Sequence, residues 1–467
     1  MHAVSTSPSA SRGSRQTSAS PHDAGPSSAA LVSVVVSLTF LAFMAGALFT
    51  IWTPYPARYY IQTRYFFENW QSELGLKPHK AMVFPTRDHR SGAVIHDRDR
   101  AMDGLTLMSG LFNQEIGLQI VDLDGTVLNS WKVDFFEIWP DPAHIAPPSE
   151  RPHNKWAFHV QGMTAFADGS VLFNVAEKGL AKMDRCGALL WTLPRMTHHA
   201  ITVADDGTLW VPSRIWHETP PAHFPGMRHS FFEDTLLNIS ADGDVLREIS
   251  LLDVLYRAGL HGLLAGTGTD TPVKGGAFGS RDPTHVNDVE VFSAVSTTAF
   301  PRVSAGDLLV SARNLDLLIA FDPATLEVKW WRTGPWLRQH DPDIQADGRI
   351  SLFNNNDDDS GGHLFGGSNI MSIDVGRDQT EIVFPRKDRS IFYSELMGTH
   401  QHLPNDNILI TESQAGRVFE LTADGEIAWE YFNRFDVDEA ALIEDAQRYD
   451  RGFFRVPSWD CAAAAAD

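Results

Sequence analysis

The sequence predicts an all-β protein, a six-bladed β-propeller preceded by a single N-terminal transmembrane helix. Two hairpin motifs alternate along the chain and recur about every 50 to 80 residues, which is typical of propeller blades. Glycine (35) and proline (26) are abundant among the 467 residues, together with aromatic residues, and this composition favours strands and turns over helices. A run of 23 uncharged residues precedes the repeats and supplies the membrane helix.

The N-terminal region divides into a tail and an anchor. Residues 1–28 are rich in Ser, Ala and Pro, which predicts a disordered cytoplasmic tail. Residues 29–51 would form a helix of roughly 34 Å, long enough to span a bilayer. A cleaved signal peptide is the alternative, because Ala45-Gly46-Ala47 resembles a cleavage site. The short tail and the large C-terminal part favour a propeller on the periplasmic, extracytoplasmic side.

A linker at 52–100 connects this anchor to the repeats. Its first residues include Trp52, Tyr55, Tyr59 and Tyr60, which suit a membrane interface. Residues 56–75 are expected to form an amphipathic helix along that surface.

The first hairpin motif places alternating apolar residues around a tight turn, often with Trp in its second strand. It occurs at 118–131, 180–191, 236–249, 318–331, 370–384 and 418–431. Six copies at blade spacing predict six blades.

A second hairpin motif interleaves with the first. It occurs at 160–174, 198–213, 284–313, 339–355 and 400–413. Two hairpins per blade give four strands, so we expect the propeller to cover 101–435 and to be followed by a C-terminal extension at 436–467. The end of that extension, DCAAAAAD (460–467), matches neither hairpin motif and predicts no structure of its own.

Charge and motif content exclude several function classes. The net charge of −21 makes nucleic acid a poor partner. Cys186 and Cys461 belong to no CxxC or CxxCH motif, and whether they pair is left open by the sequence. Without a P-loop, a strand-linked GxGxxG or a GxSxG elbow, no cofactor and no metal is expected.

Histidines recur at one place in the second motif. Gln161, His199 and His340 lie seven residues before the turn aspartates of their hairpins, and His285 and His400 (or His402) hold the related place in divergent copies. Equivalent places in successive blades lie around one central axis, so these histidines are predicted to meet at one mouth of the channel. Structural hydrogen bonds between blades are the alternative role for each of them.

Two arginines, Arg214 and Arg313, end inner strands on the same ring. Imidazoles together with guanidinium groups indicate an anion site, although an arginine paired with an acid of the next blade is the commoner arrangement. The run from Asn354 to Asp359 offers oxygen ligands for a cation, but it lacks the spacing of a calcium loop and fits a solvated acidic loop better.

The part of the chain from about Gly104 to Asn433 resembles the bacterial arylsulfotransferase family. The segments that carry this resemblance include THHAITVADDGTLWVPSR (197–214), DPTHVNDVEVF (282–292), GDLLVSARNLDLLIAFDPATLEVKWWRTGPW (306–336), QHDPDIQADGRISLFNN (339–355) and GTHQHLPNDNILITESQAGRVFELTADGEIAWEYFN (398–433).

The resemblance implies an exported enzyme that moves a sulfuryl group from an aryl sulfate to a phenol through a sulfohistidine. By its motifs, His400 is the expected nucleophile, with His285 and His340 as acid, base and oxyanion donors. Arg313 is expected to anchor the sulfuryl group and His199 to support the site. Arg214, His402 and Asn355 are expected to contact the substrate. The expected partners are small phenols, aryl sulfates and, through the helix, a membrane.

One departure from the family pattern leaves other functions open. The site arginine expected after the QHD segment is missing from FNNNDDDSGGHLFGG. Arg313, from the earlier SAR segment, is expected to substitute for it. A non-catalytic propeller that serves as a scaffold or subunit of a membrane assembly is therefore the main alternative. A quinoprotein-type or metal-dependent enzyme is a third, since IAFDPATLEVKWW is similar to a quinoprotein docking motif but occurs convincingly once.

Overall fold

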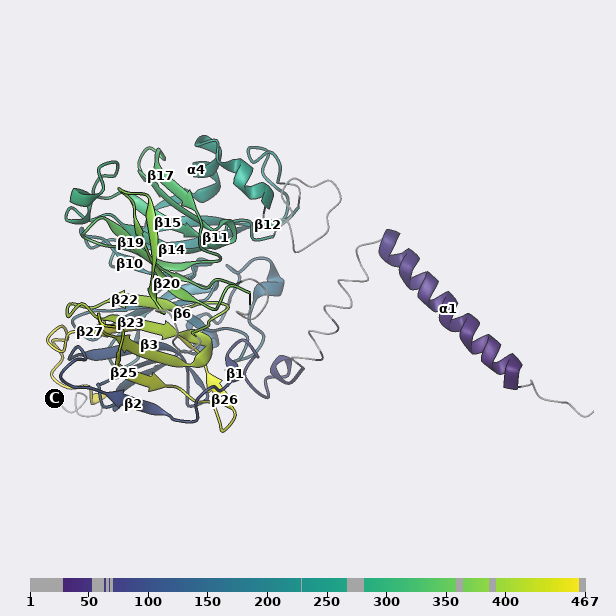
Figure 1. Cartoon of the computed structure of the whole chain (residues 1–467), viewed down its shortest axis with the longest axis horizontal. Coiled ribbons are helices and arrows are strands. Elements are labelled where there is room, and N and C mark those ends of the chain that lie inside the picture. Colours follow the sequence, from purple (N-terminus) through teal and green to yellow (C-terminus); the bar gives the residue numbers. More distant parts are fainter. Residues whose placement is uncertain are drawn as a thin grey trace, which may run out of the picture. The chain divides into compact units, whose positions relative to one another are not determined.

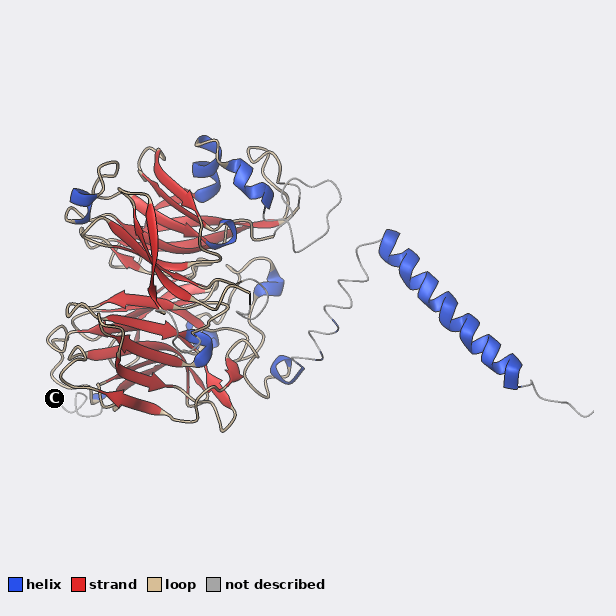
Figure 2. Cartoon of the chain, in the orientation of Figure 1, coloured by secondary structure: helices blue, strands red, loops and turns tan. Residues whose placement is uncertain are grey.

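The computed structural model describes residues 28–52, 63, 67, 70–227, 229–266, 281–357, 364–385 and 392–461. It divides into two units, residues 1–67 and 68–467. The second unit is a six-bladed β-propeller, whose sheets are seen edge-on and face-on in Figure 1 and as red arrows in Figure 2. The predicted fold class is therefore confirmed.

Each blade is an antiparallel sheet. The first blade contains β27 (Ile443–Tyr449), β3 (Leu105–Phe112), β4 (Glu115–Val121) and β5 (Val127–Lys132). The second contains β6 (Val160–Ala165), β7 (Val171–Val175), β8 (Gly179–Met183) and β9 (Leu189–Leu193), and the third β10 (Thr202–Val203), β11 (Leu209–His217), β12 (Phe231–Ile239) and β13 (Val245–Ser250).

The remaining three blades follow the same order from the channel outward. The fourth contains β14 (Val286–Val291), β15 (Leu308–Ala312), β16 (Leu317–Phe321) and β17 (Val328–Thr333), and the fifth β18 (His340–Ile344), β19 (Arg349–Asn354), β20 (Asn369–Asp374) and β21 (Gln379–Phe384). The sixth contains β22 (Thr399–His402), β23 (Ile408–Glu412), β24 (Arg417–Leu421), β25 (Ile427–Phe432) and, outermost, β2 (Gly92–His96).

Short elements fill the connections between these strands. They are β1 (Val83–Pro85) paired with β26 (Glu439–Ala441), the helices α3 (Phe135–Ile138) and α4 (Leu251–Arg257), and the 3₁₀ turns η1 (Pro148–Glu150), η2 (His261–Gly266), η3 (Ser296–Ala299), η4 (Arg313–Leu315) and η5 (Ser413–Ala415).

The sheets extend beyond the expected range of 101–435 at both ends. β2 lies before that range and pairs with β25, while β27 lies after it and pairs with β3. The first blade therefore takes its innermost strand from the C-terminal end of the propeller. This explains why the sequence holds six outer hairpins but only five inner ones, because the sixth inner pair, β27 with β3, is not a hairpin.

Tryptophan side chains in the second strands of the outer hairpins connect neighbouring blades. Trp131 of β5 donates from Nε1 to the carbonyl of Asp184 in the second blade, and Trp429 of β25 donates to Leu123 in the first, both at 2.8 Å. Trp191 of β9 packs on the turn of the third blade, where a side chain at Gly243 would collide with the indole ring. The Trp of the repeated motif is therefore an inter-blade contact, with its indole N–H satisfied by a turn carbonyl.

The C-terminal segment after β27 folds back onto the first two blades. Trp459 contacts the ring of Trp131 edge-on, with 6.2 Å between ring centroids. Cys461 forms a disulfide with Cys186, which lies in the turn between β8 and β9. The open question of their pairing is thus answered by a covalent link across 275 positions of sequence.

The first unit contains one long helix, α1 (Ser28–Trp52). Its residues Ala29–Ala47 are apolar and long enough to cross a membrane, a property that a signal sequence shares. The expected tail lies outside the described residues except for Ser28. Of the amphipathic helix expected at 56–75, residues 63, 67 and 70–73 are helical and most of the others lie outside the described residues.

A buried ion pair supports the closure of the ring. Arg448 of β27 lies 3.1 Å from Glu420 of β24, and neither side chain is exposed. The same guanidinium donates to the hydroxyl of Thr106 on β3 and to the carbonyl of Met102. One side chain thus joins the last strand to the first and sixth blades.

Arg448→Met is expected to lower the free energy of unfolding of the full-length protein by about 3–5 kcal/mol, because it leaves the Glu420 carboxylate buried without its charge partner. Chemical denaturation in detergent micelles measures this change. Arg448→Met combined with Glu420→Met should cost less than Arg448→Met alone. A loss below about 1 kcal/mol in the single variant would contradict this role for the pair.

Candidate functional site

The innermost strands are irregular where they enter the channel. The register shifts between Val160 and Met163 in β6, Val286 and Asp288 in β14, His340 and Asp343 in β18, and Ile443 and Asp445 in β27. Such bulges redirect the side chains on either side of them. His199 and His285 also have positive φ angles, of 52° and 48°, which are costly for residues other than glycine.

His340 presents a neutral imidazole with a fixed tautomer. Its Nδ1 lies 2.6 Å from Oδ1 of Asn355 and 3.2 Å from the carbonyl of Arg338, and both oxygens can only accept. Asn355 is oriented by its own amide, which donates to the carbonyls of Ser394 and Met397. Nδ1 therefore carries the proton and Nε2 carries the lone pair. Burial, with the charge of Arg313, lowers the pKa of His340 to about 3.

His285 has the opposite electrostatic environment. Its Nδ1 lies 2.5 Å from Oδ2 of Asp282, whose other oxygen accepts the backbone N–H of His285 at 3.1 Å. Burial alone would lower the pKa of His285, but the charge and hydrogen bond of Asp282 outweigh it and the pKa is raised. Burial would raise the pKa of Asp282, yet its interaction with His285 lowers it to about 2. The two groups form a carboxylate–imidazolium pair.

His199 lies between these two histidines. Its ring centroid is 5.1 Å from that of His285 and 6.2 Å from that of His340. Its Nδ1 contacts Nδ1 of His198 at 2.9 Å, and its backbone N–H donates to Oε1 of Gln161 at 2.7 Å. Burial, followed by its cationic neighbours, lowers the pKa of His199 well below the usual value, so this ring is neutral.

Arg313 supplies the positive charge of this cluster. It directly follows β15, and its backbone N–H donates to the carbonyl of His285 at 3.0 Å. Nη1 donates to Oδ1 of Asn314, whereas Nη2 is buried and finds no hydrogen-bond partner among the described residues. A buried guanidinium with an unused donor is costly unless an anion accepts from it. We refer to His199, His285, His340 and Arg313 as the histidine cluster.

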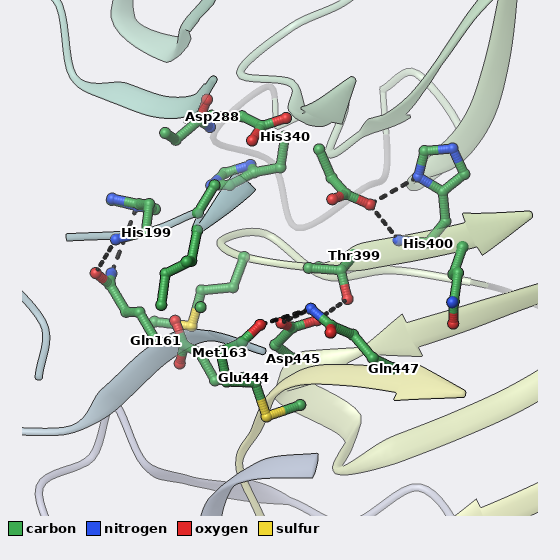
Figure 3. A pocket seen from close by; sticks show the side chains of 18 of the residues that line it. Gln161, Met163, His199, Asp288, His340, Thr399, His400, Glu444, Asp445 and Gln447 are labelled. Carbon is green, nitrogen blue, oxygen red and sulfur yellow. Dashed lines mark hydrogen bonds and ion pairs between the residues drawn. The ribbon is translucent and has the colours of Figure 1, made fainter. Parts of the chain in front are cut away.

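A cavity of about 200 Å³ lies beside this cluster (Figure 3). His199 and His340 line it from one side, and Thr399 and Gln447 line it from the other. Thr399 donates to Oδ1 of Asp445 at 3.0 Å. Imidazoles therefore lie on one side of the cavity, and acidic groups lie on both, with Asp288 beside His340 and Asp445 beside Thr399 (Figure 3).

The lining of the cavity is rich in carboxyl groups: Asp288, Glu290, Asp341, Asp343, Glu444 and Asp445. Burial, followed by neighbouring carboxylates, raises the pKa of Asp445 to about 7. Burial likewise raises the pKa values of Asp288, Glu290 and Glu444 well above their usual range. These four groups are wholly or partly protonated near neutral pH, so the wall repels an anion less than its composition suggests.

His400 lies apart from the histidine cluster, across the cavity (Figure 3). Its side chain is fully buried, and both ring nitrogens are engaged. Nδ1 lies 2.8 Å from Oδ2 of Asp341, and Nε2 lies 2.8 Å from Oγ of Ser351. β22 pairs with β23 without a bulge, so adjacent side chains of β22 point to opposite faces of the sheet. Thr399 bonds to Asp445 of the first blade, and the adjacent His400 therefore bonds to the fifth blade.

The other expected substrate contacts have structural partners. Arg214 lies 2.7 Å from Glu177 and stacks over the ring of Phe232 at 3.9 Å, so its charge is used between blades. Asn355 acts through His340, as described above. In the run from Asn354 to Asp359, Asp357 forms an ion pair with Arg338 at 2.8 Å, while residues 358 and 359 lie outside the described residues.

The structure adds residues that the sequence analysis did not single out. Asp282 precedes His285 by three residues in the same DPTHVN segment, which is the signal that would have identified it. His198 precedes His199 directly and lies 3.4 Å from Asp234 through Nε2. Arg338 immediately precedes the QHD segment and accompanies Arg313 near the histidine cluster.

Comparison with known proteins identifies a family for most of the propeller. The profile described as arylsulfotransferase (ASST) matches residues 162–434, which is more than half of the chain. The matched region contains the histidine cluster, Asp282 and Asn355. None of the curated proteins matches the chain.

Among solved structures, the similarities are distant. A protein of unknown function from Bacteroides caccae is 12% identical, with a TM-score of 0.46, and the match covers 74% of this chain and 98% of that one. A catalytically inactive virginiamycin B lyase from Staphylococcus aureus, with quinupristin, is 12% identical with a TM-score of 0.37, covering 75% of this chain and 87% of that one. TM-scores this low support no functional inference.

Asp282→Asn should change how stability depends on pH. The folded-state pKa of His285 is raised, so its contribution to stability is present below about pH 6.5 and is lost as pH rises through the folded pKa. The stability difference between wild type and Asp282→Asn is therefore expected to shrink as the pH rises from 6 through the raised folded-state pKa of His285. Denaturant titrations of the full-length protein at several pH values measure it. A constant difference over this interval would contradict the carboxylate–imidazolium pair.

Proposed function

We propose, from the premise that this chain belongs to the arylsulfotransferase family, that it is a membrane-anchored, exported enzyme. It transfers a sulfuryl group from an aryl sulfate to a phenolic acceptor through a sulfohistidine. The family supports a sulfotransferase-like function. The observation that carries the finer proposal is a neutral His340 with an available Nε2 beside an imidazolium, His285, and an incompletely bonded guanidinium, Arg313.

The first half-reaction moves the sulfuryl group from the donor to the enzyme. The lone pair of His340 Nε2 attacks sulfur, the N–S bond forms, and the bond from sulfur to the phenolic oxygen breaks. His285 gives its proton to the departing phenolate and becomes neutral. Arg313 donates from Nη2 to a sulfuryl oxygen, where it stabilises charge without rearrangement. Asn355 keeps its hydrogen bond to Nδ1–H, which becomes more acidic as the ring takes the sulfuryl group.

The second half-reaction reverses these roles. The acceptor phenol gives its proton to neutral His285 while its oxygen attacks sulfur, and the N–S bond breaks to restore His340. Sulfuryl transfer resembles phosphoryl transfer, so catalysis rests on positioning and charge stabilisation. The fixed tautomer of His340 and the Asp282–His285 pair supply that positioning.

This assignment differs from the expectation that His400 is the nucleophile. A nucleophilic imidazole needs a ring nitrogen with a free lone pair. Both ring nitrogens of His400 have partners, and its side chain is wholly buried. His340 has only acceptors at Nδ1, which leaves the lone pair on Nε2, so it fits the role better.

Two features support a location outside the cytoplasm. The helix at Ala29–Ala47 is apolar and long enough to serve as an anchor or as a signal sequence. The Cys186–Cys461 disulfide persists in oxidising compartments and is reduced in most cytosols.

His340→Asn is expected to abolish transfer from 4-nitrophenyl sulfate to phenol. Because it removes the attacking nitrogen, the rate should fall at least about a thousandfold. The full-length protein in detergent micelles is assayed by nitrophenolate release, and mass spectrometry detects the sulfuryl adduct on the donor-treated enzyme. His400→Asn tests the alternative nucleophile, and His96→Asn is a matched control in β2, on the outer edge of the sixth blade.

Loss of the adduct in His400→Asn with retention in His340→Asn would overturn the assignment. Absence of turnover across a panel of aryl sulfates and phenols would favour the scaffold function instead.

Arg313→Met should lower kcat/KM by about a hundredfold to a thousandfold, because it removes a buried donor to the sulfuryl oxygens. Arg332→Met serves as a control, since Arg332 lies on β17, the outer strand of the fourth blade, and pairs there with Asp378 of the fifth blade. Steady-state kinetics with varied donor measure the effect. An unchanged kcat/KM would remove Arg313 from the mechanism.

A further inference from the structure

A second group of functional side chains lies on the side of the cavity away from the histidine cluster. Asp343, His400 and His402 each direct a ligand-type atom toward the others, and these atoms all lie within 4.8 Å of one another. Nε2 of His400 is 3.5 Å from Oδ2 of Asp343. Two ligands of a tetrahedral ion at about 2.1 Å are separated by a comparable distance.

The hydroxyl of Ser351 lies between the two histidines. The Ser351 hydroxyl lies 2.8 Å from Nε2 of His400 and 3.1 Å from Nε2 of His402. It already accepts from the amide of Gln345 at 3.2 Å. The hydroxyl has one proton and two lone pairs, so it can bridge both imidazoles, and it holds their Nε2 atoms near one point.

His400 is held as metal ligands commonly are. Oδ2 of Asp341 accepts from Nδ1 of His400 at 2.8 Å and also accepts the backbone N–H of the same residue. In the neutral ring this leaves the lone pair on Nε2, where a metal ion would replace the Ser351 hydroxyl as its partner. A carboxylate behind a histidine fixes the tautomer and orients the ring toward a metal.

From this geometry we infer that Asp343, His400 and His402 bind a divalent transition-metal ion, with Asp341 as the group that orients His400. Two imidazoles and one carboxylate suit Zn²⁺ and its first-row neighbours, and three protein ligands leave a further coordination position open. His402 is exposed and Asp343 is partly exposed, which gives the ion a path from solvent.

The assignment accounts for a site that sequence patterns do not predict. His400 and His402 lie on one strand, whereas Asp343 lies on the neighbouring blade. Since Asp343 and His400 line the cavity, a bound dication would also offset negative charge on its acidic wall. The inference does not depend on the proposed transfer reaction, because metal binding is measured without substrate.

The test uses the full-length protein in detergent micelles, freed of its purification tag and stripped with EDTA. Co²⁺ is titrated while visible absorption is recorded, and Zn²⁺ then competes for the site. Wild type is expected to bind one Co²⁺ per chain and to exchange it for Zn²⁺. His402→Ala changes an exposed side chain and should weaken binding at least about a hundredfold, as should Asp343→Asn.

Two further variants separate a metal site from nonspecific binding. Asp341→Asn keeps all three ligands and should weaken binding by about 10- to 100-fold through the orientation of His400. His96→Ala removes another histidine that faces a carboxylate, Asp124 at 3.0 Å, and should bind as wild type does. Failure of wild type to bind one ion, or equal binding by His402→Ala and His96→Ala, would overturn the inference.

Discussion

The pairing of β27 with β3 is the constraint on which the rest of the structure depends. It completes the first blade, closes the ring and leaves no innermost strand without a partner. The channel exists only when the ring is closed. The histidines of three different blades come together only in that closed ring. The Arg448–Glu420 pair, the inter-blade tryptophans and the C-terminal disulfide all act on this same closure.

Within the closed ring, the channel changes character along its length. The histidine cluster holds a guanidinium, an imidazolium and two neutral imidazoles, while the lining of the neighbouring cavity includes carboxyl groups held largely protonated by burial. One fold thus brings together the histidine cluster and a separate group of histidine and carboxylate side chains on the inner strands. The bulges in β14 and β18 make this possible, because they change which side chains face the channel within a few residues.

The predictability of each feature follows from how local it is. The six outer hairpins were readable because each joins two strands by a tight turn of its own. The closing strand was not, since β27 and β3 are separated by more than 300 positions and share no turn. Motif spacing predicted that His199, His285 and His340 come together, and their rings do lie close to one another. It did not give the direction of the His400 ring, which depends on β22 lacking the bulge that β18 has. The ion pair of Asp357 with Arg338 was not predictable either, because the two residues are separated by 19 positions of sequence.

The placement of the closing strand has a consequence in time. The first blade is begun early in synthesis, yet its inner strand comes from Ile443–Tyr449. At about 5–20 residues per second, roughly 15 to 60 seconds separate the synthesis of β5 from that of β27. Throughout that interval the inner edge of β3 offers unpaired backbone groups to any other strand that it meets. The nascent chain therefore carries its greatest aggregation hazard in the blade it makes first, and the bond to Cys461 can form only after that hazard has passed.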